Sequence, residues 1–319
     1  PPDGSVTLED GLCIGVPKRV LAAAFVAACS IFFENRDEPN ESSVLAALDA
    51  TRVILLFDPE HLTAANFRRL QLEESVSGLK SDSTNSRRLH LELNFLDSIL
   101  TSPLHRQSKS PTLWSYRSWI INAFDLWSCI ARRNARDGGW EALSADFTRE
   151  LGVVLKSAER HPKNYYAWQY ARRLIRQSTE SRGDVDPSMP PVSEILVLST
   201  RTTHDWCIRN PSDTSAWSFL YFLLRRLHET EHKFQEATSR TLELARSFHW
   251  KHEAVWVFLR TVIADSELTS KQERAKYLQE MESEFGMNGS LPPTSEATSI
   301  RTPHPALEAM VWIRRNTKT

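Results

Sequence analysis

Hydrophobic residues recur along the chain with the three- and four-residue spacing of amphipathic helices, and the alternation typical of strands is scarce. Stretches rich in Pro, Ser and Gly interrupt this pattern and predict loops at 78–86, 101–111, 181–191 and 286–305. Two helix starts are marked clearly. Asp58-Pro59-Glu60 offers an N-cap, a first-turn proline and a first-turn acid, and Ser270 to Glu273 reads as a capping box.

The sequence also repeats. Five stretches align on one anchor position, and successive anchors lie 39 to 54 residues apart, enough for two helices of about 12 residues and a connection. A single helix hairpin buries its apolar face only against a neighbour. The repeats therefore predict an all-α fold in which helix hairpins stack into an α-α superhelix, or solenoid. The anchors are Ala65, Trp114, Trp168, Trp217 and Trp256.

This pattern divides the chain into an N-terminal helical cap at 1–57, the solenoid at 58–285, and a loop with a C-terminal helix at 286–319. A degenerate sixth copy is expected at Trp312. Each anchor tryptophan stands about one turn into its helix and is followed by apolar residues on the same face, so we interpret all four as structural.

One apolar run, Val20 to Phe33, has 14 residues, short of the ~20 needed to span a bilayer, and predicts a buried helix. The four cysteines lie far apart without a Cys-x-x-Cys pair, which disfavours a disulfide framework and a thiolate zinc site. Together these features favour a reducing, cytoplasmic location and no transmembrane segment. The net charge of −1 argues against a protein that coats nucleic acid.

The third repeat, Pro-Lys-Asn-Tyr-Tyr-Ala-Trp-Gln-Tyr-Ala-Arg at 162–172, resembles the repeat of the protein prenyltransferase α-subunit family. The resemblance extends from about 58 to 263. It implies a subunit of a heterodimeric transferase whose β subunit carries the zinc and the isoprenoid pocket, so this chain alone is expected to bind no cofactor. The implied substrates are a prenyl diphosphate, most often geranylgeranyl in the branch it resembles, and a protein with C-terminal cysteines.

The resemblance also implies site residues. The family places a lysine five residues before the second-repeat tryptophan, which is Lys109 here, and this catalytic lysine contacts the isoprenoid diphosphate. The positions near substrate in the third repeat correspond to Lys163, Asn164, Tyr165 and Tyr166. Positive charge at this place is chemically sensible, because it stabilises the negative charge that grows on the departing diphosphate.

Other interpretations stay open. Lys109 could be an ordinary solvated lysine, and Asn164 a helix cap. Erosion of the motif, with Ala65 at the first anchor and Ser110-Pro111 in place of Asn-Tyr, suggests as an alternative a non-catalytic scaffold for protein–protein interaction. His228-Glu-Thr-Glu-His232 matches a zinc-peptidase motif, but it falls in a charged stretch where two repeat helices should turn. We therefore expect no metal on this chain.

Overall fold

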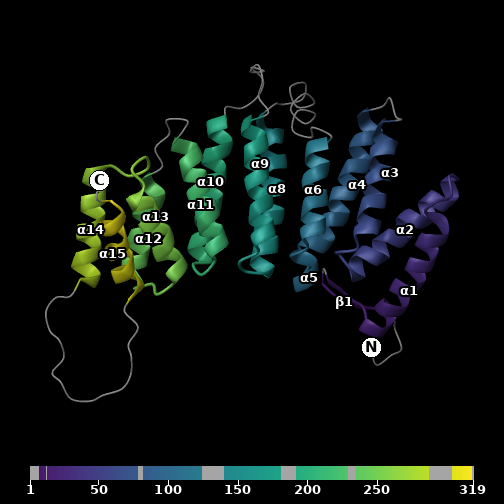
Figure 1. Cartoon of the computed structure of the whole chain (residues 1–319), viewed down its shortest axis with the longest axis horizontal. Coiled ribbons are helices and arrows are strands. Elements are labelled where there is room, and N and C mark those ends of the chain that lie inside the picture. Colours follow the sequence, from purple (N-terminus) through teal and green to yellow (C-terminus); the bar gives the residue numbers. More distant parts are fainter. Residues whose placement is uncertain are drawn as a thin grey trace, which may run out of the picture. The chain divides into compact units, whose positions relative to one another are not determined.

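The structure, a computed structural model, describes residues 7–11, 13–77, 82–123, 140–180, 192–228, 235–286 and 304–317. These ranges hold 14 helices and one short antiparallel hairpin of β1 (Leu8–Asp10) and β2 (Cys13–Gly15), shown in Figure 1. The helices are α1 Lys18–Asn35, α2 Glu41–Phe57, α3 Leu62–Ser77, α4 Asp82–Leu100, α5 His105–Ser108, α6 Pro111–Ala123, α8 Trp140–Arg160, α9 Tyr165–Glu180, α10 Val192–Arg209, α11 Thr214–His228, α12 Gln235–Ser247, α13 Glu253–Ala264, α14 Lys271–Phe285 and α15 Pro305–Asn316. The predicted all-α fold of helical repeats is confirmed.

The chain forms two compact units. Unit 1 contains Pro1–Cys129 and Lys156–Tyr170, and unit 2 contains Ile130–Leu155 and Ala171–Thr319. In unit 1, α1 packs on α2, α2 on α3, and α3 and α4 both pack on α6. In unit 2, α10 packs on α11, and α13 contacts α11, α12, α14 and α15. The three-part division by repeats stays a prediction. No helix of the described ranges is long and apolar enough to cross a membrane.

Four of the five anchor repeats start their helix in the same way, whereas His252, four residues before Trp256, makes no side-chain cap. In these four, the residue four before the anchor accepts a backbone N–H of the first turn through its side chain. The acceptors are His61, Ser110, Asn164 and Asp213, with donor–acceptor distances of 3.2, 3.0, 3.4 and 2.9 Å. Such caps satisfy N–H groups that the helix itself leaves unpaired. The repeat therefore encodes a capped turn as well as a tryptophan.

The anchor side chains are buried in all five repeats. Three of the tryptophans also close the turn before their helix, because each indole N–H donates to a backbone carbonyl six residues earlier. Trp114 donates to Ser108 at 2.9 Å, Trp217 to Pro211 at 3.1 Å and Trp256 to Trp250 at 2.7 Å. A buried indole requires such a partner, so the tryptophan fixes the inter-helix turn as well as filling the core.

Two helix starts test the sequence signals. The capping box of Ser270 and Glu273 is present at the start of α14, as predicted. The predicted start at Asp58-Pro59-Glu60 is wrong, because α3 begins only at Leu62. Asp58 instead closes a turn, in which its carboxylate accepts the Glu60 N–H at 3.2 Å and its carbonyl accepts the His61 N–H. Asx turns of this kind compete with helix formation.

The apolar run that begins at Val20 is helical, as predicted, but the expectation that it is buried is wrong. Only Ala28 and Phe32 of α1 are buried, and Val26 is 65% exposed. The helix packs chiefly on α2, so only one of its faces meets the core. Periodicity could not reveal this, because the run carries no charged residue to mark a solvent side.

Trp312 lies in α15, but it does not take the anchor position. It stands eight residues after the N-cap His304, whereas each anchor stands four residues after its cap. Its ring is half-buried, with the Arg260 guanidinium 5.3 Å from its centroid.

Candidate anion-binding site around Lys109

Lys109 lies in the short connection between α5 and α6 and is half-buried. Its neighbours Ser108 and Ser110 are buried, and both are held by hydrogen bonds. The Ser110 hydroxyl accepts the Leu113 N–H at 3.0 Å and contacts the Pro59 carbonyl at 3.0 Å. Because the backbone on each side of Lys109 is anchored, this lysine is presented from a fixed loop.

The Ser108 carbonyl is the central acceptor of this loop. It accepts the Trp114 indole N–H at 2.9 Å, the Asn164 side-chain amide at 2.9 Å and the Ser157 hydroxyl at 3.4 Å. Asn164 also donates to the Ser157 hydroxyl at 2.9 Å. Side chains from two repeats therefore converge on the residue directly before Lys109, and this arrangement joins the second repeat to the third.

Two histidines lie beside Lys109. The rings of His105 and His161 meet edge to face, with centroids 5.2 Å apart. Nε2 of His161 lies 3.1 Å from the Pro103 carbonyl and donates to it. Burial lowers the pKa of His161, the Pro103 carbonyl partly offsets this, and the nearby charges of His105 and Lys109 lower the pKa further. At neutral pH His161 is therefore an uncharged donor next to a cation.

Lys109 has no carboxylate partner in the described part of the chain: no ion pair to its ammonium group is formed there. The neighbouring Arg106 differs, because it pairs with Asp58 at 2.7 Å. A half-buried, uncompensated ammonium group on an anchored loop is an attractive site for an anion such as a phosphate oxygen.

The third-repeat residues have different environments. Asn164 is fully buried, and both of its amide donors bond within the protein. Its side-chain oxygen accepts the Ala167 N–H, so the structure shows the capping role that the sequence offered as an alternative. Tyr165 and Tyr166 are exposed, with ring centroids 5.6 Å apart. Lys163 is exposed and takes φ of 61°, a left-handed conformation uncommon for lysine. A substrate role for these four residues stays a prediction.

Sequence analysis missed His105, His161, Ser108 and Ser157. A local signal existed for His105, one helical turn before Lys109, and for Ser108, directly before it. Ser157 and His161 matter through contacts across 49 and 58 residues of sequence, which no local motif encodes.

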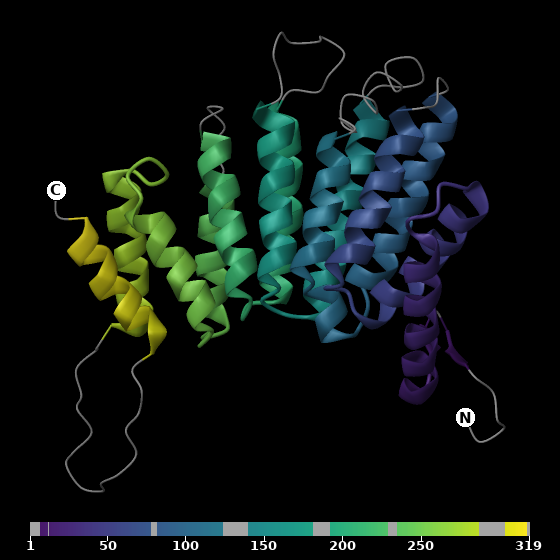
Figure 2. The same cartoon turned by 45° about the vertical axis from the view of Figure 1, so that its right-hand side comes forward.

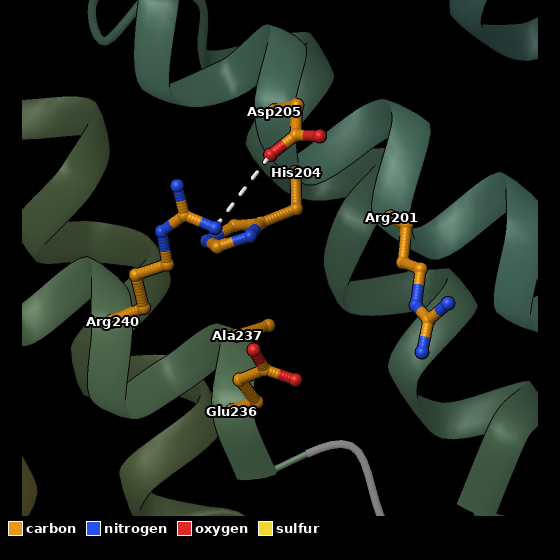
Figure 3. Close-up of a pocket in the computed structure, with 6 residues that line it drawn as sticks. All are labelled: Arg201, His204, Asp205, Glu236, Ala237 and Arg240. Atoms are coloured by element: carbon orange, nitrogen blue, oxygen red, sulfur yellow. Dashed lines mark ion pairs between the residues drawn. The ribbon is translucent and has the colours of Figure 1, made fainter.

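A second polar site lies in unit 2 between α10 and α12 (Figure 3). Its pocket has a volume of about 170 Å³ and is lined by Arg201, His204, Asp205, Glu236, Ala237 and Arg240. Nε2 of His204 donates to the Thr241 hydroxyl at 2.9 Å, since that hydroxyl donates onward to the Ala237 carbonyl. Burial, with the Arg240 charge, lowers the pKa of His204 to about 4, so it is neutral at pH 7. The charges of the two arginines and the two carboxylates cancel, so this pocket favours neither anions nor cations as ligands.

Only the first residue of the zinc-peptidase motif, His228, lies within the described ranges. His228 is exposed at the end of α11, and residues 229–232 lie outside the described ranges. Within those ranges no three His, Cys, Asp or Glu side chains are grouped as metal ligands.

Comparison with known proteins gives distant similarities. A family model described as the ECM9 middle domain matches residues 139–248. The protein prenyltransferase alpha subunit repeat-containing protein 1 of Danio rerio is 25% identical over 187 residues, 57% of this chain and 38% of that protein. The geranylgeranyl transferase type-2 subunit alpha is 25% identical over 183 residues in Homo sapiens, 57% of this chain and 26% of that protein. The Bos taurus subunit is 25% identical over 206 residues, 64% of this chain and 29% of that protein.

The similarity is to prenyltransferase α subunits. The matches cover less than two-fifths of these relatives' own length. They support a transferase-related protein built from this type of repeat.

Proposed function

We propose that this chain is the α-type subunit of a heterodimeric protein prenyltransferase. In this proposal a β subunit supplies the zinc and the isoprenoid pocket, and the α-type chain organises that subunit and contributes Lys109. The transferred group is geranylgeranyl, by analogy with relatives named geranylgeranyl transferase type-2 subunit alpha, and the acceptor is a protein with C-terminal cysteines. Location in the cytoplasm belongs to the same proposal.

One observation supports the proposal: Lys109, which the resemblance places at the family's lysine position, lies on a loop that is anchored by hydrogen bonds from two repeats. When an acceptor thiolate attacks the prenyl carbon, the carbon–oxygen bond breaks and negative charge collects on the diphosphate. An ammonium group already held near that position stabilises this charge without reorganising. Lys163, Tyr165 and Tyr166, which are exposed, are proposed to contact substrate or the β subunit.

The proposal is tested by co-expression with the β subunit of a type-2 geranylgeranyl transferase. We expect the two chains to co-purify and to transfer labelled geranylgeranyl to a cysteine-tailed protein. Lys109→Ala should lower kcat about 100-fold, because it removes one charge-stabilising group, and should leave co-purification unchanged. The matched control is Lys156→Ala, since Lys156 is exposed and pairs only with Glu159 at the surface. Equal turnover in the two variants would contradict the role of Lys109.

A second candidate is a non-catalytic scaffold. It is favoured by one observation: the buried Asn164 uses its amide donors within the protein and is not available to a diphosphate. A scaffold would pair with a β subunit or another protein without supporting transfer, and Lys109→Ala would have no effect. The co-expression experiment separates the two candidates, because it measures pairing and transfer independently.

A further inference from the structure

One face of α1 is exposed and largely apolar. On its inner side α1 packs against α2 (Figure 2). The rings of Phe25 and Phe57 stack there with centroids 4.5 Å apart, and the ring of Phe32 meets that of Phe67 in α3 at 5.4 Å. The opposite side of α1 is exposed to solvent. Between Arg19 and Glu34 this exposed side carries no charged residue.

Six exposed residues of α1 share this outer face at intervals of three and four positions, the spacing of one helix face. We name them the α1 stripe: Arg19, Ala23, Val26, Ala27, Ser30 and Glu34. No charged residue lies between Arg19 and Glu34. The exposed side chains of Ile31 and Phe33 flank the stripe and widen the apolar surface.

Contiguous exposed apolar surface on a water-soluble helix is typical of an interaction site. The α1 stripe therefore favours a partner that covers it.

The charges at the two ends of the stripe indicate which partner fits. Arg19 and Glu34 make no ion pair within the described part of the chain, and they have opposite signs. A second copy of α1 packed antiparallel places Arg19 of each copy opposite Glu34 of the other. A parallel copy would instead place like charges together.

The same antiparallel register is self-complementary along its whole length. It sets Ala23 opposite Ser30 and Val26 opposite Ala27, and the two-fold axis passes between positions 26 and 27. Both ends then receive an ion pair, as an isologous interface requires. The small side chains at its centre let the two helix axes approach closely, so that Val26 and the flanking Ile31 and Phe33 are covered.

We propose that this protein forms a homodimer through antiparallel packing of the α1 stripes of two copies. The proposal concerns α1 alone and does not depend on the proposed enzymatic function.

The first test is sedimentation of the full 319-residue chain over a concentration series. We expect dimers at micromolar concentration. Val26→Glu, which buries two carboxylates at the centre of the interface, should give monomers. Val311→Glu is the matched control, because Val311 is also an exposed valine but lies on α15, and this variant should remain dimeric. A wild-type chain that is monomeric up to about 0.1 mM overturns the proposal, and so does a dimer that Val26→Glu leaves intact.

The second test addresses the register. Arg19→Glu and Glu34→Arg should each weaken the dimer about tenfold, because every substitution occurs twice across a two-fold interface. Combining them restores opposite charges in the antiparallel register, so the double variant should dimerise within about twofold of the wild type. Circular dichroism and thermal melting of each variant verify that α1 still folds. Single variants without effect, or a double variant as weak as the singles, would overturn the antiparallel arrangement.

Discussion

In the described part of each unit, an arginine, a carboxylate and a tyrosine meet in a hydrogen-bonded network, and these two networks differ in burial. In unit 1, Arg68 of α3 binds Glu92 of α4 through two parallel hydrogen bonds of 2.8 and 2.5 Å, and the Tyr116 hydroxyl donates to Glu92 at 3.0 Å. In unit 2, Tyr221 and Arg225 of α11 bind Asp265 at 2.8 and 2.9 Å. The chemistry is the same, yet the Arg68 side chain is 4% exposed and that of Arg225 is 40% exposed.

This difference determines what each network does. The buried arginine uses its remaining donors on the Thr51 hydroxyl and the Leu48 carbonyl, so it ties α2, α3 and α4 together. Tyr116 adds α6, the helix that follows Lys109, to the same network. We infer that the buried network fixes the frame behind the candidate site, whereas the exposed one only reinforces the contact between α11 and α13.

Burial also governs the protonation equilibria of the first network. Burial by itself lowers the pKa of Arg68, but the charge of Glu92 and its hydrogen bond outweigh this and raise it. Burial and the neighbouring Glu92 carboxylate raise the pKa of Tyr116 well above its usual value, although Arg68 partly opposes them. Arg68 and Tyr116 therefore both keep their protons at neutral pH.

The largest expected effect comes from breaking the buried network. Glu92→Gln leaves the Arg68 charge buried without a counter-ion, so we expect a loss of about 3–5 kcal/mol in the free energy of unfolding. Urea denaturation followed by circular dichroism measures it. The matched control is Glu267→Gln, because the Glu267 side chain is 60% exposed and pairs with Arg225 of the other network. A loss below about 1 kcal/mol would show that the ion pair of Arg68 and Glu92 does not hold the surrounding helices in place.

Sequence analysis could identify the helices and the anchors, because apolar spacing and the repeated tryptophan are local signals. The distance from Trp114 also singles out Lys109, whose role stays a prediction. Sequence analysis could not reveal that Glu92 pairs with Arg68, since the two residues lie on different helices, 24 positions apart in the sequence. The cap that Asn164 forms with the Ala167 N–H is local, so the sequence could offer it as an interpretation. The bond from the Asn164 amide to the Ser108 carbonyl, 56 residues earlier, could not be predicted.

An intermediate effect is expected at Asp265 in the half-exposed network. Burial alone would raise the pKa of Asp265, but hydrogen bonds from Tyr221, the Glu267 N–H and Arg225 outweigh it and hold the pKa below its usual range. Asp265→Asn replaces an acceptor oxygen by a donor and should cost about 1–2 kcal/mol at pH 7.

The pH dependence follows from the direction of that shift. Because the folded pKa of Asp265 lies below its unfolded value of about 3.9, the ionised carboxylate stabilises the fold above that value. This contribution is lost as the pH falls through the folded pKa. The difference in unfolding free energy between wild type and Asp265→Asn should be constant from pH 7 to about 5 and shrink below pH ~4. A difference that grows in acid would contradict the assigned hydrogen bonds.

The smallest effect is expected at Arg225, the counterpart of Arg68 in this comparison. Arg225→Ala removes ion pairs to Asp265 at 2.9 Å and to Glu267 at 2.6 Å, but water can replace the half-exposed guanidinium at both carboxylates. Tyr221 still donates to Asp265, so no buried charge is left without a partner. We therefore expect a loss of at most about 1 kcal/mol, which 0.5 M salt should reduce further. The measurement is the same urea titration at low and high salt. A loss as large as that of Glu92→Gln, or one that salt leaves unchanged, would mean that burial does not distinguish the two networks.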